Sequence, residues 1–203
     1  TREHVAFNRQ VVDAGYDVDE IDHRLASSID LARDGHPVMR LAVTVALEHY
    51  TAVLAHAWLK DERHLAAMPD EIRRLWQWHS IEEIEHKGVA YDTLMHVLRD
   101  VSPFKRWLIR SRTMLSVTRT FWSQRARDMA ILLEQDDLNT ARTWWRIARF
   151  AFVSPGLLRQ CLPAWLAFFK PGFHPWEIDD RALIRTVEAG LGKDVESNLE
   201  LAA

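Results

Sequence analysis

The chain has 203 residues, of which 48% are hydrophobic and 27% charged, and this is ordinary for one globular domain with a real core. Its formal net charge of −3 at pH 7 excludes the strongly basic field by which many proteins recruit nucleic acid, so no nucleic-acid partner is expected. Cys161 is the only cysteine in the sequence, which excludes a disulfide framework and favours a reducing compartment, the cytoplasm.

The first half of the chain repeats apolar residues at helical spacing, and no strand-like alternation stands out. Helices are expected over residues 1–14, 17–35, 36–60 and 70–100. Gly15 and Gly35 follow the first two as terminators, and Pro37 suits the first turn of the third. No run of about 18 uncharged apolar residues occurs, so no transmembrane helix is expected.

The second half continues the same pattern. Further helices are expected over 103–134, 137–153, 155–169 and 181–191, with a turn over 170–180. No repeat, low-complexity linker or domain boundary is visible. The sequence therefore predicts a single all-α domain over residues 1–203, built as a helical bundle.

The helix expected over 70–100 gathers acids and histidines in its middle. At about 100° per residue, Glu83 and His86 fall on one core-like stripe, with His79 and Glu82 at its margin, while Glu85 points away. Glu83 and His86 form Glu-x-x-His, the spacing by which one helix of a di-iron carboxylate bundle offers two ligands to a metal pair.

Glu48 is a second candidate ligand, on a different helix. It lies in the middle of an apolar stripe of the helix expected over 36–60, where an ionised carboxylate costs several kcal/mol unless a cation or hydrogen bonds compensate it. We therefore predict that Glu48, Glu83 and His86 are metal ligands. The alternatives are a solvated charged face around Glu83 and, for His79, a core histidine.

Four segments of the sequence, in order, resemble one known family. They are REHVAFN (2–8), ALEHYTA (46–52), WQWHSIEEIEHKGVAYD (76–92) and KPGFHPWEIDD (170–180). The family they resemble is catalogued as predicted metal-dependent hydrolases, and its ligand pattern is similar to that of ferritin-like di-iron proteins. The resemblance implies a ferritin-like bundle with additional C-terminal helices and a complete site of two metal ions.

The resemblance also implies a second Glu and a second Glu-x-x-His on helices that precede residue 2 in relatives. This sequence does not contain them, so we expect it to be N-terminally incomplete and to carry half of the site. His4 would then follow the missing ligands by one turn, as an extra ligand or as a partner of one. His49, about 100° from Glu48 around its helix, is expected at a helix interface or hydrogen-bonded to a ligand.

The ligand pattern points to one chemistry and the family's label to another. A Glu-rich site with Glu-x-x-His on helices is typical of oxygen activation, which favours a non-haem di-iron oxidoreductase acting on a small apolar substrate. The alternatives are a metal-dependent hydrolase, as the label states, and a non-catalytic metal-binding or interaction bundle. Iron is the expected metal, with manganese or zinc as alternatives. No catalytic residue and no organic cofactor is assigned.

Two surfaces suggest partners. Residues 104–128 interleave arginines with aromatic residues, which predicts either peripheral contact with an anionic membrane or an arginine-rich outer face of the bundle. The aromatic stretch 144–169 is expected to line an apolar pocket, to form a homodimer interface or to make core.

Overall fold

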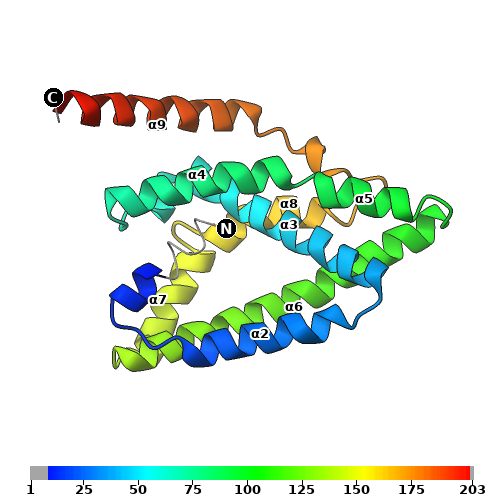
Figure 1. Cartoon of the computed structure of the whole chain (residues 1–203), viewed down its shortest axis with the longest axis horizontal. Helices are drawn as coiled ribbons and strands as arrows, with labels where there is room; N and C mark the ends of the chain where they lie inside the picture. The colour runs from blue at the N-terminus through cyan, green and yellow to red at the C-terminus, as the bar shows by residue number, and fades with distance from the viewer. Residues whose placement is uncertain (1–8, 202–203) are drawn as a thin grey trace. The chain divides into compact units, whose positions relative to one another are not determined.

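The computed structural model describes residues 9–201, and every regular element in this range is a helix (Figure 1). Residues 9–13 are helical and end at Gly15, whose φ of 91° is left-handed. The α-helices that follow are α2 (Asp19–Arg33), α3 (Pro37–Lys60), α4 (Asp70–His86), α5 (Val89–Val97), α6 (Pro103–Gln135), α7 (Ala141–Phe152), α8 (Leu157–Ala167) and α9 (Arg181–Leu201). Short 3-10 turns occupy Glu62–His64 (η1) and Pro175–Glu177 (η2). The predicted all-α class is confirmed, whereas the ferritin-like bundle stays a prediction.

The expected helix over 70–100 is wrong as a single element. The structure ends α4 at His86 and restarts the chain as α5 at Val89. Gly88 lies at the break and faces the indole of Trp176, which leaves no room for a side chain there. The last helix is longer than expected, because α9 continues past 191 to Leu201.

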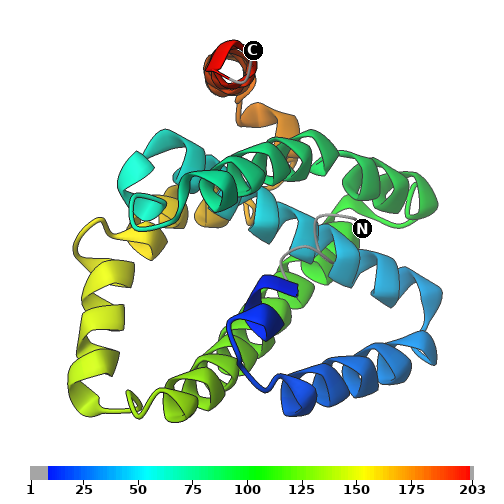
Figure 2. The ribbon, with the colours of Figure 1, turned by 60° about the vertical axis from the view of Figure 1, so that its left-hand side comes forward.

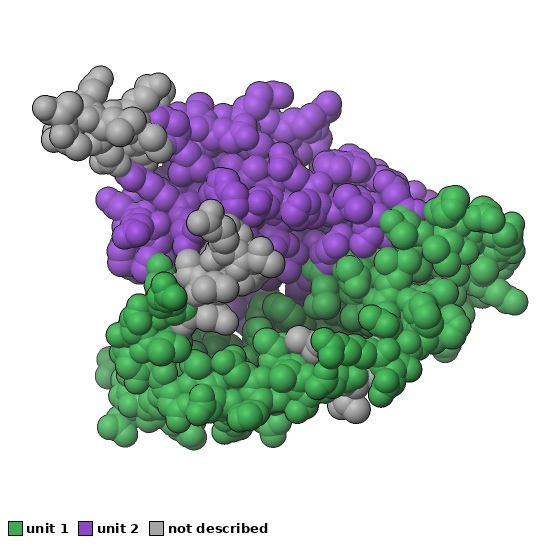
Figure 3. Space-filling model, in the orientation of Figure 1, with its two compact units in different colours: residues 1–47, 93–149 green, residues 48–92, 150–203 purple. Residues whose placement is uncertain are grey.

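Two compact units divide the chain (Figure 3). Unit 1 combines residues 1–47 with 93–149, and unit 2 combines residues 48–92 with 150–203. Each unit is built from two separate stretches of sequence, so each depends on contacts between residues far apart in the chain. The single domain over residues 1–203 stays a prediction.

Unit 1 packs α2 against the C-terminal half of α6. Arg24 on α2 forms an ion pair with Asp128, which is buried, and Arg125 lies 2.5 Å from the other oxygen of the same carboxylate. Near the start of α2, the Tyr16 hydroxyl donates to Asp136 at 2.7 Å. Charged pairs as well as apolar contacts therefore hold this unit together.

The core of unit 2 lies between α3 and α4. Ala55 and Leu59 of α3 meet Ile81 and Ile84 of α4, and all four are buried. The apolar side of α9, with Leu183, Ile184, Val187 and Leu191, packs against this cluster. Figure 1 shows α9 beside α4, and Figure 2 shows it nearly end-on.

The chain between α8 and α9 is also fixed within unit 2. Phe168 and Phe173 are buried and their rings pack on the imidazole of His49 from α3. The Tyr91 hydroxyl donates to the carbonyl of Phe173, and His174 caps η2 while it contacts Asp92 at 2.8 Å. The segment 170–180, expected to be a turn, therefore contains η2 and packs against the start of α5.

Of the helices described, α3 is the one that is long and apolar enough to cross a membrane by length and composition. Half of its most apolar window is buried in the structure, and the core helix of a soluble protein passes the same test. The expectation of no membrane span and the expected compartment both stay predictions.

Candidate functional site

Glu48 is the candidate ligand with the most unusual surroundings. It is half-buried on α3, and its Oε2 atom is buried without a hydrogen-bond partner among the described residues. Burial raises the pKa of its carboxyl group, and the charge of nearby Glu83 adds to the rise. The backbone N–H of Ala90 and the nearby His86 act in the opposite direction. An ionised Glu48 therefore has one buried oxygen without a hydrogen bond, in keeping with the cost that the sequence predicted for a carboxylate on this apolar stripe.

The α4 candidates are arranged differently from the helical-wheel expectation. Glu85 is exposed, as predicted, but so is His86, which was expected to face inward. His79, expected at the margin, is the better buried histidine, with its side chain 12% exposed. Its Nε2 lies 3.3 Å from Oε1 of Glu83, and its Nδ1 lies 3.8 Å from Oε2 of Glu82. His86 differs from the expectation because α4 ends at this residue, which therefore lies in the last turn, next to the interruption between α4 and α5.

These residues do not form a finished metal centre. Within residues 9–201, no group of three or more His, Cys, Asp or Glu side chains is arranged to hold a metal ion. Glu48, Glu83 and His86 are close enough to influence one another's charge, and the buried, unpartnered Oε2 of Glu48 fits a cation. The described residues thus include donors that suit a metal ion, but these donors do not form a complete coordination group.

The two remaining candidates have different outcomes. His4 lies outside the described residues. His49 is buried between Phe168 and Phe173, and its Nε2 lies 3.2 Å from the carbonyl oxygen of Ala164. This is a helix-interface position, one of the two that the sequence left open for it.

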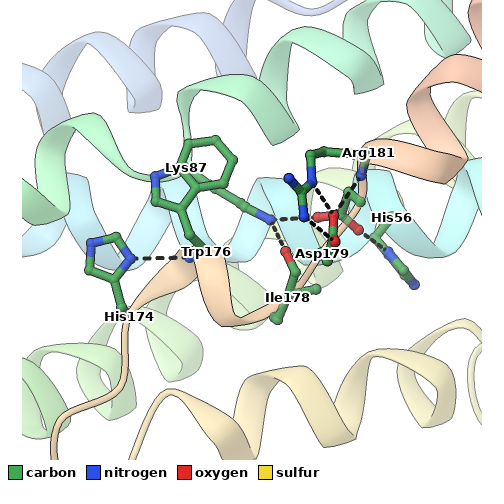
Figure 4. Close-up of polar contacts among 8 residues, drawn as sticks. His56, Lys87, His174, Trp176, Ile178, Asp179 and Arg181 are labelled. Atoms are coloured by element: carbon green, nitrogen blue, oxygen red, sulfur yellow. Dashed lines mark hydrogen bonds and ion pairs between the residues drawn. The ribbon is translucent and has the colours of Figure 1, made fainter.

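A second polar cluster lies elsewhere in unit 2 (Figure 4). Lys87, which is buried, donates from Nζ to the Ile178 carbonyl at 2.6 Å and to Oδ2 of Asp180 at 2.5 Å. The other carboxylate oxygen of Asp180 lies 2.5 Å from Nδ1 of His56 on α3. Burial alone raises the pKa of Asp180, but the hydrogen bonds from His56 and Lys87 outweigh burial and lower it. Asp180 is therefore an ionised carboxylate shared by two donors.

This cluster borders a cavity of about 190 Å³ that lies wholly within unit 2. The apolar part of its wall comes from Ala52, Val53, Pro163, Ala164 and Ile178. The polar part comes from His49, His56, Lys60, Lys87, Gln160 and Asp180. Lys60 and Pro163 are exposed, so the cavity opens to solvent.

Reasoning from the sequence missed this cluster. Lys87 stood in a charged run next to His86, where a solvated side chain is the usual expectation, and Asp180 stood in a segment expected to be a turn. The single local signal is Gly88, since a glycine inside a helical pattern often marks a close approach of another part of the chain.

The basic aromatic segment 104–128 lies within α6. Its arginines do not form one face: Arg110 is buried, whereas Arg112 and Arg119 are exposed. Phe104, at the start of the helix, is 67% exposed. Membrane contact through this segment stays a prediction.

Comparison with known proteins gave one finding. A family model described as "Predicted metal-dependent hydrolase" matches residues 1–179. No curated protein and no solved structure matches the chain.

Proposed function

The chain belongs to the family of predicted metal-dependent hydrolases, and on this premise we propose that it is a metal-dependent hydrolase whose metal donors include Glu48, Glu83 and His86. The observation that carries the proposal is the buried Oε2 of Glu48, which has no hydrogen-bond partner among the described residues. A buried carboxylate oxygen in this state is costly unless it is protonated or meets a cation.

The neighbours of Glu48 have distinct roles in this proposal. Glu83 adds a second negative charge, which raises the pKa of Glu48 in the absence of a cation and would favour a bound one. His79, 3.3 Å from Glu83, would hold that carboxylate in place rather than bind the metal itself. His86 is exposed and close to Glu48, so it is the donor that can turn toward an ion entering from solvent.

A bound divalent ion would supply an acidified water and polarise a carbonyl or phosphoryl oxygen, which is the chemistry of metal-dependent hydrolysis. The carboxylates would neutralise part of its charge, and their number and type suit zinc, manganese or iron. The substrate class follows from neither the family description nor these donors.

Oxygen activation is the second candidate function. It is favoured by one observation: Glu48 on α3 lies beside the Glu-x-x-His pair Glu83 and His86 on α4, which is half of the ligand set of a di-iron bundle. In this case the metal would be a pair of iron ions, and the substrate a small apolar molecule. A non-catalytic metal-binding bundle is the outcome if metal binds but neither activity is found.

Elemental analysis of the purified chain, with Glu48→Ala, Glu83→Ala and His86→Ala variants, tests the metal donors. Each substitution is expected to remove most of the bound metal, whereas Glu85→Ala, on the exposed side of the same helix, leaves the metal content unchanged. Equal metal content in all variants would sink the assignment of donors. Activity that persists without oxygen and with zinc supports hydrolysis, and activity that needs oxygen and iron supports the second candidate.

A further inference from the structure

The cavity beside His56 and Asp180 carries an inference that goes beyond the metal donors. We propose that it is a substrate site for short-chain esters, with His56 as the general base that Asp180 positions. Glu48 and His56 are eight residues apart on α3, about 12 Å along the helix axis, so the two sites are separate.

The hydrogen bond to Asp180 decides which nitrogen of His56 is basic. The ionised carboxylate accepts from Nδ1 at 2.5 Å, so the proton of the neutral imidazole lies on Nδ1 and the lone pair on Nε2. The other oxygen of Asp180 accepts from Lys87, and Figure 4 shows where Lys87 and His56 lie. The same arrangement, with a buried aspartate orienting a histidine, is how catalytic histidines are held as bases.

Lys87 is the second partner of Asp180, beside His56. Its ammonium group, 2.5 Å from Oδ2, already balances the charge of Asp180. Lys87 therefore supplies the positive charge beside Asp180, and His56 supplies a hydrogen bond to the other carboxylate oxygen. The His56 side chain is 32% exposed and lines the cavity, so water and a small ligand can reach it.

The size and lining of the cavity set the substrate class. A volume of about 190 Å³ holds a group near the size of benzene, which occupies an engineered cavity of about 150 Å³. Ala52, Val53 and Ala164 offer apolar contact to a short acyl chain. Lys60 is a cation at the exposed edge that can stabilise negative charge on a carbonyl oxygen.

The proposed reaction is hydrolysis. His56 Nε2 takes a proton from water as its oxygen attacks the ester carbonyl carbon. The bond from that carbon to the alcohol oxygen then breaks, and the alcohol leaves with the proton from His56. One ester and one water give one acid and one alcohol, and no metal donor takes part.

The test uses the full chain, treated with chelator and dialysed, with 4-nitrophenyl acetate as the probe. His56→Gln is expected to lower kcat by about 100-fold or more, with little change in KM. His23→Gln, which removes an exposed imidazole from α2, controls for ester hydrolysis by surface histidines and leaves kcat unchanged. Added imidazole should restore part of the activity of His56→Ala, which a purely structural role would not allow.

One further variant keeps the test independent of folding. Ala164→Leu enlarges a side chain in the cavity wall and leaves His56 and Asp180 themselves unchanged, and it is expected to raise KM. Equal activity in folded His56→Gln, or loss of all ester hydrolysis on chelation, would overturn the proposal. Metal content is measured separately, so failure here and failure of the metal donors are distinguishable.

A different observation, on α7, supports a second inference. No Asp or Glu occurs between Leu138 and Trp176, while α7 carries Arg142, Arg146 and Arg149. No residue of this helix is buried, and Trp145 is 69% exposed. At about 100° per residue the three arginines lie within an arc of about 60°, and Trp145 borders this arc, about 40° from Arg149.

We infer that α7 binds the surface of an anionic lipid bilayer. A helix with a cationic side, exposed aromatic residues and no acid is complementary to negatively charged headgroups above an apolar layer. This surface is distinct from residues 104–128 of α6, for which membrane contact stays a prediction.

Sedimentation with vesicles tests this inference on the full chain. Binding is expected with phosphatidylcholine vesicles that contain phosphatidylglycerol, and it should weaken with added salt. The triple variant Arg142→Gln, Arg146→Gln, Arg149→Gln should lose binding, whereas Arg112→Gln, Arg119→Gln, Arg127→Gln, on exposed positions of α6, should keep it. Loss in the α6 variant alone, or equal binding to neutral vesicles, would refute the role of α7.

Discussion

Lys87 Nζ and Asp180 Oδ2 lie 2.5 Å apart, and the two side chains are 3% and 4% exposed. Burying both charges is costly, and the geometry offsets that cost because each charge has a further partner. Lys87 donates to the Ile178 carbonyl, and Asp180 accepts from His56. The pair therefore joins the end of α4 to the start of α9 and, through His56, to the C-terminal part of α3, all within unit 2.

Removal of one partner of this pair should destabilise the protein strongly. Lys87→Met leaves Asp180 with a buried charge and one donor fewer, and a loss of about 3–5 kcal/mol in the free energy of unfolding is expected. Urea denaturation followed by circular dichroism measures it. Arg181→Ala breaks an exposed pair with Asp179 and should change stability little. Equal effects of the two substitutions would contradict a structural role for the buried pair.

In the metal-free protein, the contribution of Glu48 to the free energy of unfolding should increase as the pH falls from 7 toward 5. Burial raises the pKa of Glu48 in the folded state, so above its unfolded pKa the unfolded chain releases this proton first. Stability from this group is therefore lost as the pH rises. Glu48→Gln should remove this contribution, and Glu85→Gln should keep it. The comparison needs denaturation curves at both pH values in the presence of chelator.

Gly88 and Gly190 should respond to alanine in opposite directions. A Cβ at Gly88 would lie 2.4 Å from Nε1 of Trp176, and the resulting overpacking should cost about 1–3 kcal/mol. Gly190 lies within α9 and has nothing within 4 Å of the added Cβ, so Gly190→Ala should stabilise by about 0.5–1 kcal/mol. Thermal unfolding compares them. Trp176→Ala in the Gly88→Ala background should recover part of the loss, and an unchanged double variant would argue against the contact.

Cys161 should be inert in the folded protein. Burial raises the pKa of its thiol to about 12, and the thiolate is the reactive form, so at pH 8 about one thiol in 10,000 is ionised. Labelling with a thiol reagent should be slow in buffer and immediate in denaturant. Fast labelling of the native protein would show that α8 opens readily.

The sequence predicted most helices because their ends carry local signals. Gly15 after the first helix, Pro37 at the start of α3 and Pro103 at the start of α6 are local signals of this kind. The contact of Gly88 with Trp176 could not be predicted in this way, because Trp176 is far away in the chain.

In the candidate site, too, features set by nearby residues could be predicted, and features set by distant residues could not. The buried carboxylate of Glu48 could be inferred from the apolar residues of its own helix. His86 was expected to be buried because the helix was extended beyond its true end. Lys87 and Asp180 are 93 residues apart, and no local pattern distinguishes them from surface charges.

The segment from 173 to 180 is fastened to residues 87–92 at three points: Tyr91 to Phe173, Asp92 to His174, and Lys87 to Ile178 and Asp180. Separating the two segments would expose Phe173, which is 1% exposed. Hydrogen exchange should therefore report the two segments as one cooperative opening unit, with similar protection on both sides of an 80-residue gap in sequence. A protease that cuts the chain between them would leave the two pieces associated.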